Sequence, residues 1–146
     1  MNKEIKNLKE LKQISFKLAK DFKLPQIVLL KGNLAVGKTQ MVQYMAQALG
    51  IESQRVDSPT FSIINFYKKN TGVGIYHVDL YRIKTEEELA DIAFWDIFYC
   101  PTVVFIEWPE LIEKKLPSLW NKLLIQLEFS KNSDQRILKL RKQLSK

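Results

Sequence analysis

The chain has 146 residues, of which 46% are hydrophobic and 27% charged, and its formal net charge at pH 7 is +7. This length suits one compact domain rather than two, and the composition is that of a soluble globular protein. The charged N-terminus and the lack of a long apolar run argue against a signal peptide or a membrane span, and the single cysteine, Cys100, excludes an internal disulfide. We therefore expect a cytoplasmic protein with one domain over residues 1–146 and no membrane partner.

The positive charge permits a nucleic-acid partner or an acidic protein partner. The lysines are spread from Lys3 to Lys146 rather than clustered, which favours an ordinary solvated surface. No RNA-binding motif is present, and we expect no DNA partner.

The first predicted element is a helix within residues 1–24. Hydrophobic side chains recur there at helical spacing with lysines between them, which predicts an amphipathic helix with room for a short strand before it. Pro25 ends this element. The hydrophobic positions are Ile5, Leu8, Leu11, Ile14, Leu18 and Phe22.

A phosphate-binding loop follows, because residues 32–39 read G-N-L-A-V-G-K-T and fit G-x-x-x-x-G-K-[ST]. The apolar run 27–30 before it predicts a buried strand, and the apolar spacing over 39–49 predicts a helix that Gly50 closes. Strand, glycine-rich loop and helix are the context that this motif requires. We therefore predict nucleotide binding.

The residue types in this loop explain the chemistry. Gly32 lets the chain turn sharply out of the strand, and Gly37 lets the backbone approach a phosphate closely. The N–H groups of the loop and of the helix N-terminus then face the anion. We expect Lys38 to reach the β- and γ-phosphates, and the Thr39 hydroxyl to bind Mg²⁺.

The middle of the chain predicts a polar loop and a hairpin. Residues 57–61, D-S-P-T-F, form either a connecting turn or a switch that responds to the γ-phosphate, and both interpretations stay open. Residues 62–68 and 75–81 predict two antiparallel strands around a loop at 70–74. Such a hairpin beside a βα unit makes the central sheet mixed.

A capping box at residues 85–88 predicts the start of a helix. The aromatic run 94–99 that follows predicts a second short helix or a surface that binds a partner, and packing in the core is the cautious interpretation. Residues 102–106 predict the most buried strand of the protein. Glu107 directly after it stands where α/β sheets bind ligands, and Asp79 ends its own apolar strand. The two acids stay equal candidates to hold Mg²⁺ or to orient water.

Two further features complete the chain. His77, the single histidine, is expected to share a strand face with Asp79, and structural and functional roles are equally open. Residues 122–129 and 135–140 predict a closing hairpin at an exposed sheet edge. The predicted fold class is α/β, a P-loop NTPase fold with a mixed parallel and antiparallel central sheet flanked by helices.

Five motifs in order resemble the TsaE family, formerly called the YjeE family, over nearly the whole chain. They are G-N-L-A-V-G-K-T (32–39), S-P-T-F (58–61), Y-H-V-D-L-Y-R (76–82), E-E-L (87–89) and I-E-W-P-E (106–110). These small P-loop ATPases are needed to form threonylcarbamoyladenosine (t6A) in bacterial tRNA. The resemblance implies a weak, Mg²⁺-dependent ATPase that binds ATP and Mg²⁺ and acts with the TsaD and TsaB proteins. It would meet tRNA indirectly, through that complex.

The resemblance also implies roles for single residues. The expected catalytic residues are Lys38, Asp79 and Glu107, and the expected magnesium ligands are Thr39, Asp79 and Glu107. Thr60 lies in the switch-like loop and Trp108 beside the nucleotide. The expected nucleotide-binding residues are Gly32, Asn33, Leu34, Ala35, Val36, Gly37, Lys38, Thr39, Gln40, Thr60 and Trp108.

The sequence departs from the family pattern at several positions. The family loop usually reads G-D-L-G-A-G-K-T, and here Asn33, Ala35 and Val36 replace Asp, Gly and Ala. Ala35 restricts backbone angles that glycine allows, so the geometry of the loop or its affinity is expected to differ. Leu11 replaces a Thr near the adenine, and Ala93 replaces a helix Gly.

Three alternatives remain in view. A small P-loop kinase of a nucleoside or other small molecule would need an arginine-bearing lid, and the four arginines of this chain are not clustered. One of them, Arg82, is a candidate to act on the phosphates in cis. A GTPase would need D-x-x-G and N-K-x-D, and neither occurs. A nucleotide-dependent assembly module without turnover has the same sequence pattern.

Overall fold

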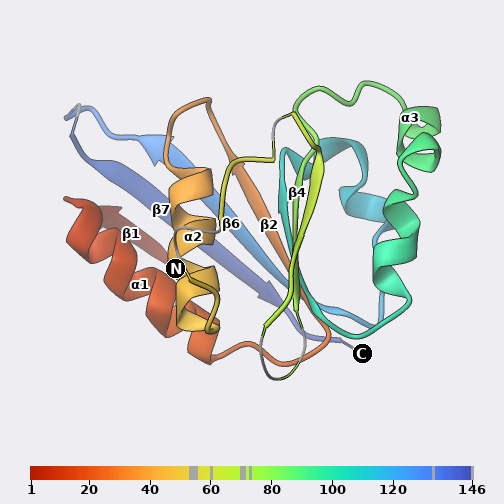
Figure 1. Ribbon diagram of the computed structural model, residues 1–146. Helices are drawn as coiled ribbons and strands as arrows, with labels where there is room; N and C mark the ends of the chain where they lie inside the picture. The colour runs from red at the N-terminus through yellow and green to blue at the C-terminus, as the bar shows by residue number, and fades with distance from the viewer. Residues whose placement is uncertain (53–55, 60, 70–71, 73, 133, 146) are drawn as a thin grey trace.

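The computed structural model describes residues 1–52, 56–59, 61–69, 72, 74–132 and 134–145. Its central feature is one seven-stranded sheet in the order β1-β7-β6-β2-β5-β4-β3 (Figure 1). The elements are β1 (Asn2–Ile5), α1 (Leu8–Lys20), β2 (Gln26–Gly32), α2 (Lys38–Ala48), β3 (Ile64–Tyr67), β4 (Ile75–Asp79), α3 (Glu86–Asp91), the 3₁₀ helix η2 (Phe94–Phe98), β5 (Val103–Glu107), the 3₁₀ helices η3 (Pro109–Leu111) and η4 (Glu113–Lys115), β6 (Asn121–Phe129) and β7 (Arg136–Gln143).

The sheet is mixed, which confirms the predicted fold class. Its centre is parallel, because β2 pairs with β6 on one side and with β5 on the other, and β5 pairs with β4. Both edges are antiparallel, where β3 joins β4 and where β7 joins β6 and β1. Hairpins produce antiparallel neighbours, whereas the parallel strands need the helical crossovers between them.

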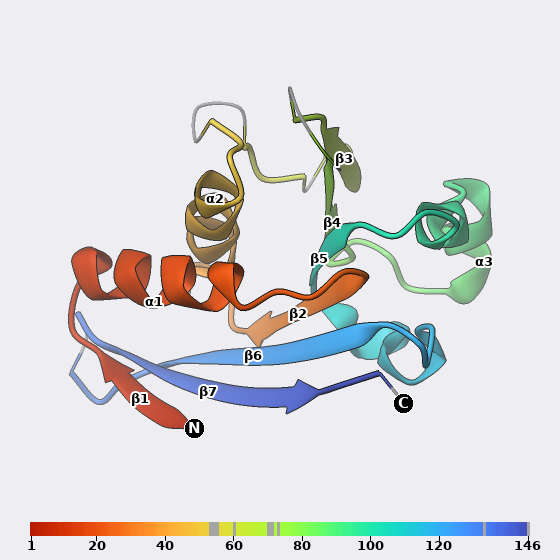
Figure 2. The same cartoon turned by 90° about the horizontal axis from the view of Figure 1, so that it is seen from below.

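The sheet separates two hydrophobic layers. Helices α1 and α2 cover one face, while α3 and the 3₁₀ helices lie on the other (Figures 1 and 2). Alternation along β2 and β5 sends Leu30 and Phe105 towards α1 and α2, and Leu29 and Ile106 to the opposite side. The central strands are buried on both faces and are therefore mostly apolar, with polar residues near their ends. No helix among the described ranges is long and apolar enough to cross a membrane.

The prediction that the closing hairpin lies at an exposed edge is wrong over part of its length. β1 pairs with β7 from Asn2 opposite Lys139 to Ile5 opposite Arg136, so β1 forms the edge. α1 then begins after Asn7, whose side chain accepts a hydrogen bond from the Glu10 backbone at 2.9 Å. Four residues are too few for strand alternation to stand out beside the helical pattern that follows.

The segment between β4 and β5 folds as two short helices against the sheet. The Thr85 backbone N–H donates to Glu88 Oε1 at 3.2 Å, as the predicted capping box requires. In η2, Phe94 is fully buried and packs edge-on against its aromatic neighbours, which confirms core packing there. Ala93 before η2 has a φ of 52°. This left-handed conformation is one that glycine adopts more readily than alanine.

Replacement of Gly32 by alanine tests the close approach of strand and loop. Gly32 has a φ of +143°, and an added Cβ would lie 2.3 Å from the Leu127 carbonyl oxygen on β6. We expect Gly32→Ala to lower the free energy of unfolding by roughly 2–5 kcal/mol, measured by denaturant unfolding, from overpacking and backbone strain together. Gly50→Ala is the matched control, since Gly50 also has a positive φ, +91°, but its Cβ would approach no atom closer than 3.4 Å. Equal losses in the two variants would contradict this account.

Candidate nucleotide-binding site

The loop between β2 and α2 has three residues in the left-handed region of φ. They are Gly32 at 143°, Ala35 at 61° and Gly37 at 114°. Ala35 is the one of the three with a side chain, and its Cβ makes this conformation less favourable by about 1 kcal/mol. The Leu34, Ala35 and Gly37 N–H groups donate no hydrogen bond within the described ranges. The amide donors of these three residues are therefore available to an anion.

Lys38 begins α2 and turns its ammonium group back over the loop. It is 6% exposed, and its Nζ donates to the carbonyl oxygens of Gly32 at 2.7 Å and Asn33 at 2.9 Å. The same nitrogen lies 4.3 Å from the centre of the Trp108 ring. Burial lowers the pKa of Lys38, and the nearby carboxylates, Glu107 foremost, oppose this shift. The Lys38 ammonium group is hydrogen-bonded to neutral carbonyl groups, and an anionic ligand can readily replace these carbonyls as its partner.

Thr39 and Glu107 connect the first turn of α2 to the end of β5. The Thr39 hydroxyl donates to Glu107 Oε1 at 2.8 Å and lies 3.2 Å from Oε2. Asp79 is the register partner of Glu107 on β4, and its Oδ1 accepts from the Tyr81 backbone at 2.9 Å. Both carboxylates are nearly buried, at 6% exposure for Asp79 and 1% for Glu107. The parallel pairing of β4 and β5 thus brings the two candidate acids together under the helix N-terminus.

His77 lies beneath this pair and is fully buried. Its Nε2 is 3.4 Å from Glu107 Oε2, and neither ring nitrogen makes a hydrogen bond within the part of the chain that the structure describes. His77 precedes Asp79 by two residues and therefore shares its face of β4. A polar ring buried without a hydrogen bond is unfavourable, and this ring lies against the Glu107 carboxylate.

These groups open into a hollow of about 270 Å³. Among the expected binding residues, Gly32, Asn33 and Val36 do not line it: the first two supply carbonyls to Lys38, and Val36 is a core residue. Thr60 lies outside the described residues. The lining residues are Leu34, Ala35, Gly37, Lys38, Thr39, Gln40, Ser58, Asp79, Glu107 and Trp108.

Two residues near the loop were not assigned roles from the sequence. Ser58 lines the hollow, and the S-P-T-F motif had pointed to its loop. Arg136, from β7, donates from Nε to the Val36 carbonyl at 3.1 Å, a contact across 100 residues that no local pattern indicates. Arg82 was the arginine considered for action on the phosphates. It is exposed and lies over the Phe61 ring at 4.5 Å, and it is not among the residues that line the hollow.

The oxygen atoms around the hollow suit a hard cation. The Thr39 hydroxyl and the carboxylates of Asp79 and Glu107 are the ligand types that Mg²⁺ accepts, usually together with phosphates and water. The described residues contain no cluster of three or more His, Cys, Asp or Glu side chains able to hold a metal by themselves. This donor set therefore fits an ion that arrives with a nucleotide better than a permanent metal centre.

Comparison with known proteins identifies the family of the chain. Residues 5–138 match the family described as "Threonylcarbamoyl adenosine biosynthesis protein TsaE". A Bacillus subtilis protein of that name is 42% identical over 113 residues, which cover 76% of this chain and 68% of the relative. A Rickettsia felis protein is 35% identical over 112 residues, covering 77% and 64%. The chain thus spans about two thirds of the length of these relatives.

A solved structure is similar to this chain over nearly its whole length. The crystal structure of Bacillus subtilis YdiB superposes with a TM-score of 0.69 at 28% sequence identity, over 96% of this chain and 83% of that one. The family match covers both the phosphate-binding loop and the strand ends with Asp79 and Glu107. The resemblance seen in the motifs is therefore confirmed, and the chain belongs to the TsaE family.

Proposed function

We propose that this protein binds and hydrolyses ATP as a subunit of the machinery that forms t6A in tRNA. The observation that carries the ATP site is the meeting of Lys38, Thr39, Asp79 and Glu107 around one hollow at the phosphate-binding loop. The relatives are named tRNA threonylcarbamoyladenosine biosynthesis proteins, which supports the same pathway here. The proposed partners are the TsaD and TsaB proteins, with tRNA reached through them.

The loop and Lys38 would hold the phosphates. The backbone N–H groups of Leu34, Ala35 and Gly37 donate no hydrogen bond to other described residues, so they are available to phosphate oxygens. Lys38 would release the carbonyls of Gly32 and Asn33 and place its charge on the β- and γ-phosphates. Charge–charge contacts in such a nearly buried place are stronger than on the surface.

Thr39, Asp79 and Glu107 would hold the magnesium ion and orient water. When bound, Mg²⁺ would neutralise charge on the transferring phosphoryl group. The Thr39 hydroxyl donates to Glu107 at 2.8 Å, so these two side chains would hold the ion together. Asp79 lines the same hollow from the adjacent strand and would supply the second carboxylate.

The site explains why turnover would be slow without a partner. No arginine is among the described residues that line the hollow, and such a cation normally stabilises the charge that develops during phosphoryl transfer. A partner that binds over the hollow would supply the missing charge or exclude water. We therefore propose a weak ATPase that TsaD and TsaB stimulate.

Replacement of Lys38 by alanine should weaken ATP binding about 10- to 100-fold, because the variant has no ammonium group to donate charge-assisted hydrogen bonds to the phosphates. Titration of MgATP against the fluorescence of Trp108, which lies 4.3 Å from the Lys38 ammonium, measures the affinity. A Trp108→Phe variant identifies the part of the signal that comes from this tryptophan, and Lys131→Ala is the control for removal of one exposed lysine. We also expect Lys38→Ala to abolish t6A formation in a reaction with TsaD and TsaB. Unchanged ATP affinity in Lys38→Ala would refute the proposed site.

His77 should act by positioning Glu107, since its Nε2 lies 3.4 Å from that carboxylate. A His77→Phe variant keeps a ring of similar size but removes the nitrogen. We expect it to need about tenfold more Mg²⁺ for half-maximal turnover, as is typical when a residue behind a metal ligand is removed. ATP binding without Mg²⁺ and the melting temperature should stay close to the original. A purely space-filling His77 would leave the Mg²⁺ requirement unchanged.

A further inference from the structure

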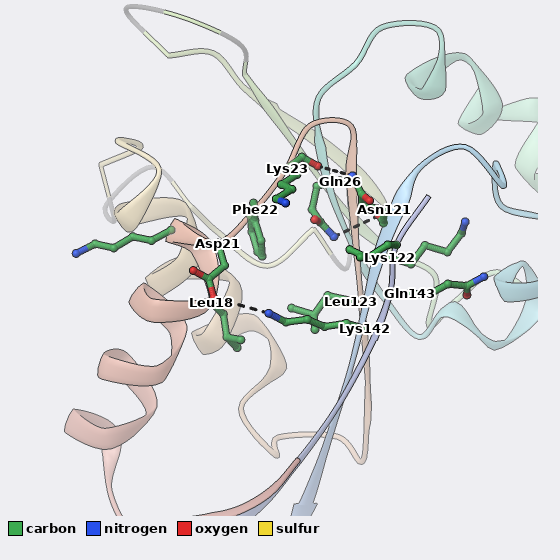
Figure 3. Close-up of a pocket in the computed structure, with 12 residues that line it drawn as sticks. Leu18, Asp21, Phe22, Lys23, Gln26, Asn121, Lys122, Leu123, Lys142 and Gln143 are labelled. Carbon is green, nitrogen blue, oxygen red and sulfur yellow. Dashed lines mark hydrogen bonds and ion pairs between the residues drawn. The ribbon is translucent and has the colours of Figure 1, made fainter. Parts of the chain in front are cut away.

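Three hollows adjoin one another at the end of the sheet away from the phosphate-binding loop. The first, of about 540 Å³, lies between the C-terminal end of α1 and the strands β6 and β7 (Figure 3). The second, of about 570 Å³, continues beneath α1 towards β1. The third, of about 320 Å³, lies beside Leu29 and Leu124 on the opposite face of the sheet and meets the first at Lys122 and Lys142. Lys142 lines all three. We call the combined region the basic surface.

The basic surface holds most of the excess positive charge of the protein. Four lysines line the first hollow, namely Lys20, Lys23, Lys122 and Lys142; the second adds Lys3 and Lys17, and the third adds Arg141. Against these seven cations stand two acids, Asp21 and Glu113. The chain has 23 basic and 16 acidic residues in all, so 16 basic and 14 acidic residues remain elsewhere. The lysines, although spread in sequence, therefore gather at one end of the sheet, most of them on the face that α1 covers.

Most of these cations form no strong ion pair with the described residues of the protein. Lys142 lies 3.7 Å from Asp21, and both side chains are 57% exposed, so this pair contributes little. Lys20 and Lys23 are exposed, and no carboxylate of the described residues lies within ion-pair distance of either. Lys122 differs, because its Nζ donates to the Pro117 carbonyl at 2.6 Å. Exposed lysines that neighbour one another repel, and a bound anion would relieve this repulsion.

The character of the surface favours a nucleic-acid backbone over a protein. Protein interfaces are depleted in lysine and enriched in exposed aromatic anchors. The one aromatic residue in the three linings is Phe22, which packs inward on Phe105 at 6.2 Å between ring centres. The linings thus offer no exposed aromatic ring on which bases could stack, whereas lysine ammonium groups bind phosphates whatever the nucleotide sequence.

We propose that the basic surface binds the phosphate backbone of tRNA directly. The choice of tRNA among nucleic acids rests on the proposed function, whereas the surface itself does not. β2 runs from Gln26, which lines the first hollow, to Gly32 at the phosphate-binding loop, and seven strand residues span roughly 20 Å. ATP and RNA therefore bind at opposite ends of the strand and do not compete. Direct contact would revise the expectation that tRNA is met through the partner proteins alone.

The test is the salt dependence of tRNA binding by the purified full chain, followed by fluorescence anisotropy of labelled tRNA without nucleotide. In the variant Lys20→Ala, Lys23→Ala, Lys142→Ala, we expect affinity at low salt to fall about tenfold or more. The slope of log affinity against log salt should become shallower by about 3, one for each phosphate that the variant no longer neutralises. The control variant Lys9→Ala, Lys68→Ala, Lys131→Ala removes the same charge from exposed positions outside the three hollows.

Equal decreases in affinity in the two triple variants, or no measurable tRNA binding by the original chain, would overturn the proposal. Polyaspartate that displaces tRNA as effectively as unlabelled tRNA would assign the surface to an acidic protein instead, and would overturn it too. Both triple variants should bind MgATP as the original chain does, measured by Trp108 fluorescence. A loss of RNA binding with intact ATP binding thus separates this proposal from the ATP site.

Discussion

The hydrogen bond from the Thr39 hydroxyl to the buried Glu107 carboxylate is the contact on which the site depends. It joins the first turn of α2 to the end of β5 at 2.8 Å. Glu107 can remain buried because Thr39, the Lys38 cation and the His77 ring surround it. Leaving a buried carboxylate without such partners would be strongly unfavourable. The parallel register that pairs Asp79 with Glu107 then places both carboxylates beside the phosphate-binding loop.

The loop itself is held from two sides. Gly32 brings the backbone so close to β6 that no side chain fits, and Arg136 from β7 donates to the Val36 carbonyl. These contacts explain how Ala35 can occupy a left-handed conformation at 61° that would be unfavourable in a free chain. Departures from the family pattern in this loop are therefore accommodated by the neighbouring strands rather than by the loop residues themselves.

Local patterns predicted much of this structure because they report local physics. The phosphate-binding loop, the capping box at Thr85 and the acids at the ends of β4 and β5 are each encoded in a short continuous stretch of sequence. Contacts between distant segments were not predictable in this way. The pairing of β1 with β7 depends on chain ends far apart in sequence, and the basic surface gathers Lys3, Lys20 and Lys142 from three elements.

The most direct test of the central claim is ATP turnover with and without the TsaD–TsaB pair, with Lys38→Ala measured beside the original chain. The account predicts slow hydrolysis by the protein alone, a clear rise when the pair is added, and the disappearance of both in Lys38→Ala. Turnover that the pair leaves unchanged, together with transfer of phosphate to a nucleoside or sugar, would contradict the account and indicate a small-molecule kinase.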